Sequence, residues 1–184
     1  MKKKPDIRWI IRIIILSFTM SVVFTLASSE IMGNAGYITA FLTLLVFIFI
    51  GVLFDIIGVA VTAAIPAPFH SMASHKEKGA VEALKLLKNA EKVSSICNDV
   101  VGDISGIVSG STSAIIVAKL VGDFSVSSML VSLLVSGVVA SLTIGGKAMG
   151  KTMAMNNSTK IVLSVGKIIN FINSIFHKRS RNKH

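Results

Sequence analysis

Acidic residues are scarce in this chain of 184 residues, which carries only 9 aspartates and glutamates against 19 lysines and arginines. Charged residues of both signs make up 15% of the sequence, whereas hydrophobic residues make up 52%. With a mean hydropathy of +0.75, this composition excludes an ordinary soluble domain and predicts an integral membrane protein. The net charge of +10 therefore indicates membrane topology and contact with anionic lipid, not a nucleic-acid partner.

Residues that usually carry catalysis or redox chemistry are also few. The single cysteine, Cys97, excludes an internal disulfide and is interpreted as a small apolar packing residue. The 4 histidines lack the spacing of zinc ligands. The sequence contains no nucleophile–base arrangement and no phosphate-binding loop, so we predict that the chain is not an enzyme and needs no catalytic cofactor.

Long apolar runs, by contrast, fill most of the chain. They predict transmembrane helices at residues 9–28, 37–64, 94–122 and 124–144. A bilayer core about 30 Å thick needs roughly 20 apolar residues for each crossing, and each run is long enough. The predicted fold class is all-α, a polytopic membrane protein with about four transmembrane helices plus cytosolic amphipathic helices.

The remaining segments are polar or amphipathic. A polar link over 29–36 joins the first two runs, and Pro66 and Pro68 are predicted to stop any helix after the second. Residues 75–92 predict an amphipathic helix, and residues 158–176 predict another that lies along the membrane surface. The basic end, 177–184, reads as a disordered tail that anionic lipid attracts.

Small residues recur at every fourth position in the last two apolar runs, a pattern that favours close packing between helices in lipid. These residues are Gly102, Gly106 and Gly110 in the third run and Ser128, Ser132, Ser136 and Ala140 in the fourth.

Lysines and arginines gather in three groups, up to residue 12, between residues 66 and 92, and from residue 147 onward. With four spans all three groups fall on the same side of the membrane, and only Lys119 falls on the other. The positive-inside rule then predicts a multi-pass protein of the cell membrane with both termini in the cytoplasm.

Two stretches resemble the membrane domain of the CNNM/CorB–CorC magnesium transporters. KGAVEALKLLKNAEKVSS, residues 78–95, is similar to the family's cytosolic segment before its next span. GKAMGKTMAMNNSTKIV, residues 146–162, resembles the signature at the foot of the last span, where the family has glycine, an acid, and then Pro-Lys-Thr-Leu-Ala and asparagine. The matching positions are Gly146, Lys151, Thr152, Ala154 and Asn156 or Asn157.

The resemblance implies a CNNM-like core at 37–156, preceded by a basic segment and an extra transmembrane helix at 1–36 and followed by the surface helix and basic tail at 157–184. Residues 55–60 fall at the place of the family's Ser-x-Ser-Glu element. The sequence departs from the family pattern at two positions. Lys147 stands where the family has its acid, which inverts the charge, and Gly150 stands where the family has proline, which affects helix shape. The chain is also expected to lack the family's CBS domains.

By the same resemblance, a magnesium ion sits between broken helices among hydroxyl, amide, carboxylate and backbone oxygens, the ligands that a hard cation prefers. Inserting an acidic residue into the membrane costs about 2.5–3.5 kcal/mol on insertion scales, so acids within a span usually have a functional role. The candidate metal ligands here are Asp55, Asn98, Asp99 and Asp103, with serines such as Ser105 beside them.

Three interpretations of these residues remain open. In the first, the acids form a variant divalent-cation site. In the second, the ammonium of Lys147 replaces the metal ion and pairs with Asp55 or with an acid of the third span, which makes a pseudo-transporter. In the third, Lys147 reaches lipid phosphate and Asp99 stays near the interface.

The predicted function is that of a CNNM/CorB-like transporter of magnesium or another divalent cation, or a degenerate relative. The alternative is a non-transporting scaffold or regulatory subunit that partners a larger transporter. A small pore-forming protein of the holin kind is a third hypothesis, based on size and the basic tail. The expected partners are the anionic cytosolic leaflet and a second copy of the chain, because small-residue stripes favour helix association.

Overall fold

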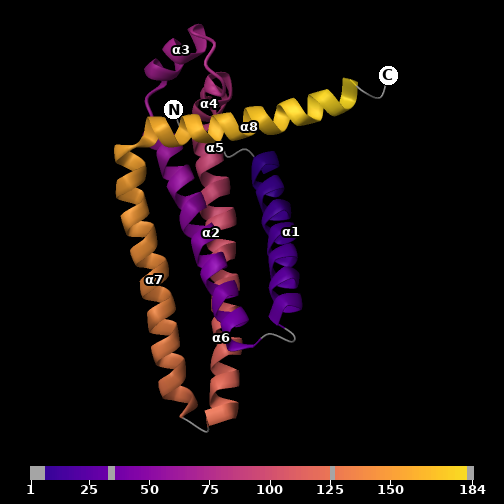
Figure 1. The fold of residues 1–184 in the computed structure, drawn as a ribbon, viewed down its shortest axis with the longest axis vertical. Helices are drawn as coiled ribbons and strands as arrows, with labels where there is room; N and C mark the ends of the chain where they lie inside the picture. The colour runs from indigo at the N-terminus through magenta and orange to yellow at the C-terminus, as the bar shows by residue number, and fades with distance from the viewer. Residues whose placement is uncertain (1–6, 33–35, 125–126, 182–184) are drawn as a thin grey trace. The chain divides into compact units, whose positions relative to one another are not determined.

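A computed structural model describes residues 7–32, 36–124 and 127–181, with side chains up to residue 175. The described residues are almost entirely helical and contain no strand, so the predicted all-α class is confirmed (Figure 1). In chain order the helices are α1 (Ile7–Met32), α2 (Tyr37–Ala63), α3 (Pro66–Ser74), α4 (Ala80–Lys88), α5 (Ala90–Ser95), the π-helix η1 (Ile96–Gly102), α6 (Asp103–Phe124), α7 (Ser128–Asn156) and α8 (Ser158–Arg181).

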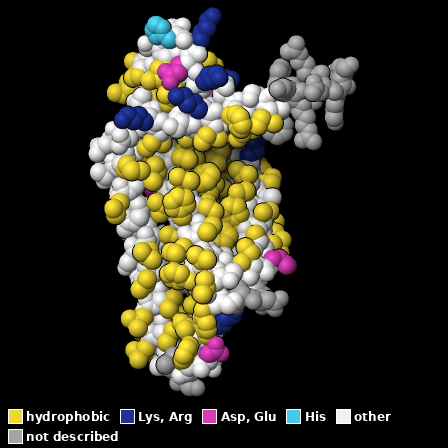
Figure 2. Space-filling model, in the orientation of Figure 1, with side chains coloured by type: hydrophobic (Ala, Val, Ile, Leu, Met, Phe, Trp, Pro, Cys, Tyr) yellow, Lys and Arg dark blue, Asp and Glu magenta, His cyan; other side chains and the backbone are white. Residues whose placement is uncertain are grey.

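The four predicted spans correspond to four helical stretches that are long and apolar enough to cross a membrane. They are Ile7–Met32, Tyr37–Ala63, Ala90–Phe124 and Ser128–Asn156. In α1 and α7 the most apolar stretch contains no fully buried residue, so many of its hydrophobic side chains are exposed. Figure 2 shows hydrophobic side chains over most of the visible face of the long helices. A surface of this kind is that of a membrane protein.

The chain folds into two compact units, each built from two separate segments. The long-helix unit comprises residues 1–54 with 96–148, and the short-helix unit comprises residues 55–95 with 149–184. Both α2 and α7 run from one unit into the other. This division follows packing, and the predicted domain boundaries after residues 36 and 156 stay a prediction.

The core of the long-helix unit lies along α2 and α6. One cluster joins Met32 at the end of α1 to apolar residues of α2 and to Ile116 of α6. A second cluster packs Phe47 against Val100, Ile104 and Val108 of the third span. Phe24 of α1 extends it, with its ring centroid 5.8 Å from that of Phe47. The contacts place α1 alongside α6 (Figure 1).

Side-chain hydrogen bonds between described residues join the helices of this unit. The hydroxyls of Ser28 on α1 and Thr112 on α6 are both buried and share a hydrogen bond of 3.0 Å. Tyr37 at the start of α2 donates to the carboxylate of Asp123 near the end of α6. Within an apolar helix pair, a buried hydroxyl without a partner costs more than a paired one, so the first bond fixes the register of α1 on α6.

The Ser28–Thr112 bond can be measured by a double-mutant cycle on thermal unfolding in detergent. Ser28→Ala and Thr112→Val are each expected to destabilise the protein, and the double variant is expected to lose less than the sum. The coupling free energy should be about 0.6 kcal/mol, the usual value between membrane helices. Strict additivity of the two single effects would contradict the bond.

The core of the short-helix unit is built around Phe69 of α3, which is fully buried. Around it pack Val61 of α2, Ala83 of α4 and Val162 of α8, all buried as well. Short helices have little intrinsic stability, so α3 and α4 depend on this cluster and on α8 for their structure.

The chain crosses α8 very closely just before α4. A methyl group built on Gly79 would lie 2.5 Å from the backbone nitrogen of Lys167, and one on Gly166 would lie 2.3 Å from the carbonyl oxygen of Gly79. Gly79 also has a φ of +85°, in the left-handed region that side-chain-bearing residues disfavour. Both glycines are therefore required for this crossing.

Several boundaries differ from the predictions. Helix α1 continues through Ser29, Glu30 and Ile31 to Met32, where a polar link was expected. The helix expected over 75–92 is shorter, because α4 begins only at Ala80, after the turn at Gly79, and α5 follows separately. Pro66 begins a helix instead of preventing one, since the first turn needs no N–H from the ring.

The C-terminal helix is longer than predicted. Its backbone continues to Arg181, into the basic segment that was expected to be disordered, while residues 182–184 lie outside the described part. On the apolar face of the amphipathic helix predicted over 158–176, the side chains of Ile168, Ile172 and Ile175 are exposed.

The small-residue stripes are mostly not packed within the chain. Gly102 contacts neighbouring helices, but a methyl group on Gly106 or Gly110 would meet nothing within 4 Å. The stripe of Ser128, Ser132, Ser136 and Ala140 on α7 is exposed throughout. Within one chain only Gly102 of these residues is closely packed, and packing of the stripes against a second copy stays a prediction.

Candidate functional site

The third span contains a break in its α-helical hydrogen bonding. Residues Ile96–Gly102 form the π-helix η1 between α5 and α6. Cys97, Val100, Val101 and Gly102 of this segment are buried in the long-helix unit. Wide helical turns of this kind are uncommon and occur frequently at functional sites, because they redirect backbone and side-chain groups. The break lies beside Asn98 and Asp99, two of the predicted ligands.

Polar groups from three helices converge on Gly102 at the end of this break. A methyl group on Gly102 would lie 3.4 Å from the carbonyl oxygen of Cys97, 3.7 Å from Nζ of Lys147 and 3.9 Å from the carbonyl oxygen of Gly51. These are ordinary van der Waals distances, so an alanine would also fit at position 102. They place Nζ of Lys147 on α7 close to the end of the π-helix.

Close packing on either side fixes the arrangement. A methyl group on Gly51 of α2 would lie 3.2 Å from Cβ of Ser105 and 3.5 Å from the carbonyl oxygen of Gly102. One on Gly146 of α7 would lie 3.0 Å from a methyl group of Val52. Two glycines thus bring α6 and α7 close to α2 at the level of the break.

Buried oxygen atoms lie in the same part of the unit. Oδ1 of Asn98 and Oγ of Ser105 are both buried, and Ser105 is only 1% exposed. Within the described residues, Oγ of Ser105 has no hydrogen-bond partner, whereas the carbonyl oxygen of Ser105 accepts a 2.7 Å bond from Ser109. A buried hydroxyl of this kind has unused capacity to bind a ligand or water.

The predicted carboxylates are placed differently. Asp99 in η1 and Asp103 at the start of α6 are both exposed on the surface of the chain. Among the described residues, no three histidine, cysteine, aspartate or glutamate side chains come together in a way that would hold a metal ion. Asn98 lies in η1, Lys147 lies close to Gly102 at the end of η1, and Ser105 packs near Gly51, whereas Asp99 and Asp103 are exposed.

Asp55 is half-buried on α2 and belongs to the short-helix unit, whereas the other predicted ligands and Lys147 belong to the long-helix unit. A pairing of Asp55 with Lys147, or a metal site that combines Asp55 with Asn98, stays a prediction.

The comparisons with known proteins leave the family open. No protein-family model, no curated protein and no solved structure matches this chain. The resemblance to the CNNM/CorB–CorC membrane domain therefore rests on the sequence elements alone and stays a prediction.

Two contributors to the site were missed in the sequence. The carbonyl oxygens of Cys97 and Gly51 carry no side-chain signal, and the π-helix that contains Cys97 has no simple sequence pattern. Gly51 could have been suspected from the sequence, because an isolated glycine in a long apolar helix often marks a close approach of another backbone.

Proposed function

We propose that this chain is a membrane protein with a CorB-like transmembrane core in which the ammonium of Lys147 stands in for the transported divalent cation. It then acts as a non-transporting scaffold or regulatory subunit, and a larger transporter is its expected partner. The observation that supports this proposal is the position of Nζ of Lys147, which lies 3.7 Å from the place that a methyl group on Gly102 would take, at the end of η1.

The electrostatic argument concerns a cation next to a fixed ammonium. Two unit charges about 4 Å apart interact by about 4 kcal/mol at an effective dielectric constant of about 20, and a divalent ion doubles this repulsion. An ammonium at this level of the span supplies positive charge where a metal ion would otherwise bring it. Lys147 is half-buried, which agrees better with an inward-facing ammonium than with one that extends fully to lipid phosphate.

A second candidate function is divalent-cation transport itself. It is favoured by the buried oxygens of Asn98 and Ser105, since amide, hydroxyl and backbone oxygens are the ligands of magnesium and calcium. For this function, Lys147 would have to leave the break whenever the ion enters.

Titration calorimetry of the purified full chain with Mg²⁺ in detergent separates the two functions. We expect no binding by the wild type and binding by Lys147→Glu, with an affinity gain above about a hundredfold because the local charge changes from repulsive to attractive. Lys147→Met tests removal of the charge without a new ligand. Lys151→Met is the matched control, since this exposed lysine lies one turn further along α7. This control variant should show no Mg²⁺ binding.

Magnesium binding by the wild type that is lost in Asp55→Asn would contradict the proposal and support transport. Flux of Mg²⁺ into liposomes that contain the wild-type protein would then be the deciding measurement.

A further inference from the structure

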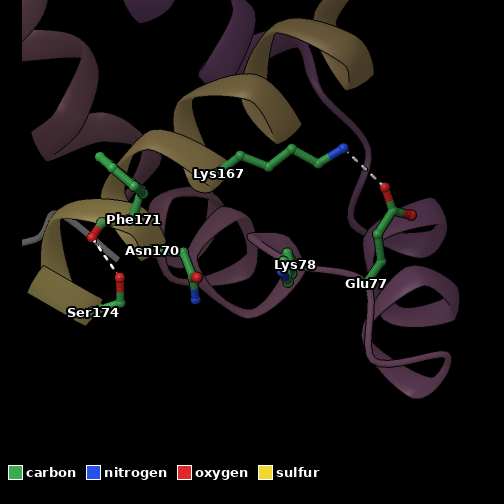
Figure 3. Close-up of a pocket in the computed structure, with 6 residues that line it drawn as sticks. All are labelled: Glu77, Lys78, Lys167, Asn170, Phe171 and Ser174. Carbon is green, nitrogen blue, oxygen red and sulfur yellow. Dashed lines mark hydrogen bonds and ion pairs between the residues drawn. The ribbon is translucent and has the colours of Figure 1, made fainter. Parts of the chain in front are cut away.

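A groove opens in the short-helix unit between the turn that precedes α4 and one face of α8 (Figure 3). Its volume is about 610 Å³. Both walls belong to the same compact unit, and the Gly79–Gly166 crossing described above holds them together. The groove is lined by Glu77, Lys78, Lys167, Asn170, Phe171 and Ser174.

The polar part of this lining is suited to an anion. Lys78 and Lys167 bring two positive charges and Glu77 one negative charge, so the groove has a net charge of 2 − 1 = +1. Nζ of Lys167 lies 3.2 Å from Oε1 of Glu77, and both side chains are partly exposed. The amide of Asn170, which also lines the groove, adds neutral N–H donors (Figure 3). Ammonium and amide donors on two facing elements are typical of a site for a phosphate group.

The apolar part continues along α8 from the same groove. Phe171 lines the groove and is 65% exposed. Ile168, Ile172 and Ile175 are exposed as well, and with Phe171 they follow the helical spacing that places side chains on one face. A ligand that fills the groove would therefore meet positive charge at one end and an uncovered hydrophobic stripe beside it.

The connectivity of the chain indicates where such a ligand would come from. Three candidate spans have an end within the short-helix unit, at Ala63, Ala90 and Asn156. Helix α8 begins at Ser158, directly after the last of these spans. Residues so close to several span ends lie near the headgroup region of the bilayer, where molecules with a phosphate group and acyl chains are abundant.

We propose that this groove binds the phosphate group of an anionic membrane lipid between Lys78 and Lys167, with the lipid's acyl chains against the exposed stripe of α8. In the bound state the phosphate competes with Glu77 for Lys167. The site shares no residue with the break in the third span, so this inference is independent of the function proposed above.

Native mass spectrometry of the full chain in detergent, with equal amounts of phosphatidylglycerol and phosphatidylcholine, tests the proposal. The wild type is expected to retain phosphatidylglycerol preferentially. In the double variant Lys78→Gln, Lys167→Gln this preference should fall by about fivefold for each lysine, the usual attraction of a lysine near an anionic surface. Glu77→Gln should raise it, because the competing carboxylate is gone.

The matched control is Lys85→Gln, Lys160→Gln, which likewise removes two exposed lysines, one from α4 and one from α8, but leaves the groove lining unchanged. It should keep the wild-type preference. An equal loss in the control would overturn the proposal in favour of diffuse surface charge, and an unchanged preference in the groove variant would overturn it directly.

A third arm adds excess inorganic phosphate to the lipid-bound wild type. Free phosphate has no acyl chains to contact Phe171 and Ile172, so the lipid should stay bound. Displacement by inorganic phosphate would reassign the groove to a soluble phosphate compound and overturn the lipid as its ligand.

Discussion

Replacement of Phe69 by alanine is expected to lower the free energy of unfolding of the short-helix unit by about 3–5 kcal/mol, the usual range for a fully buried phenylalanine. Its ring is 0% exposed and packs among Val61, Ala83 and Val162, which come from α2, α4 and α8. Because the two helices α3 and α4 have only 9 residues each, they have too little intrinsic stability to close around the cavity.

The measurement is thermal unfolding of the detergent-purified protein, followed by circular dichroism. Phe171→Ala is the matched control, because the same ring is removed from a side chain that is 65% exposed. The control should melt close to the wild type, and the Phe69 variant should show an early loss of part of the helical signal. Equal melting of the two variants would show that Phe69 does not support the unit.

Gly166→Ala is expected to destabilise the protein by about 1–3 kcal/mol, as overpacking usually does, although alanine is the better helix former. The new methyl group would lie 2.3 Å from the carbonyl oxygen of Gly79 and 3.1 Å from the backbone nitrogen of Ala83. These neighbours are backbone atoms, so they cannot rotate away, and α8 must move off α4.

Gly106→Ala is the control with the opposite expected sign. A methyl group there would meet nothing within 4 Å, so the variant should be stabilised by up to about 1 kcal/mol through helix propensity. Hydrogen exchange of the amides in α8 around Val162 provides a second readout, since a displaced helix loses protection. Unchanged exchange and melting in Gly166→Ala would contradict the close crossing.

Much of the fold could be predicted because spanning helices are determined by local composition. The second run was expected at 37–64, and α2 covers Tyr37–Ala63. The end of α1 was predicted poorly, because Ser29 and Glu30 are polar but still compatible with one more helical turn. The basic residues after 176 were read as disordered from charge alone, whereas the helix of α8 propagates through them from an amphipathic start.

The candidate site could be predicted only in part. Lys147 is recognisable in the sequence because it stands where the resembling family has an acid, whereas its position close to Gly102 depends on which faces of the third span and α7 meet. That orientation follows from tertiary packing through Gly51 and Gly146, which composition does not reveal. Asp99 and Asp103 are predicted ligands because acids within a span are costly, but the structure leaves both exposed, Asp99 in η1 and Asp103 at the start of α6.

The interleaving of the two units has a consequence for biosynthesis. The first segment of the short-helix unit ends at Ser95 and its second begins at Met149, 149 − 95 = 54 residues later. At a synthesis rate of about 5–20 residues per second, the ribosome needs roughly 3–11 s to produce that interval. During this time Phe69 and Ala83 have no α8 to cover them, which makes the nascent segment a natural substrate for chaperones and for the membrane insertion machinery.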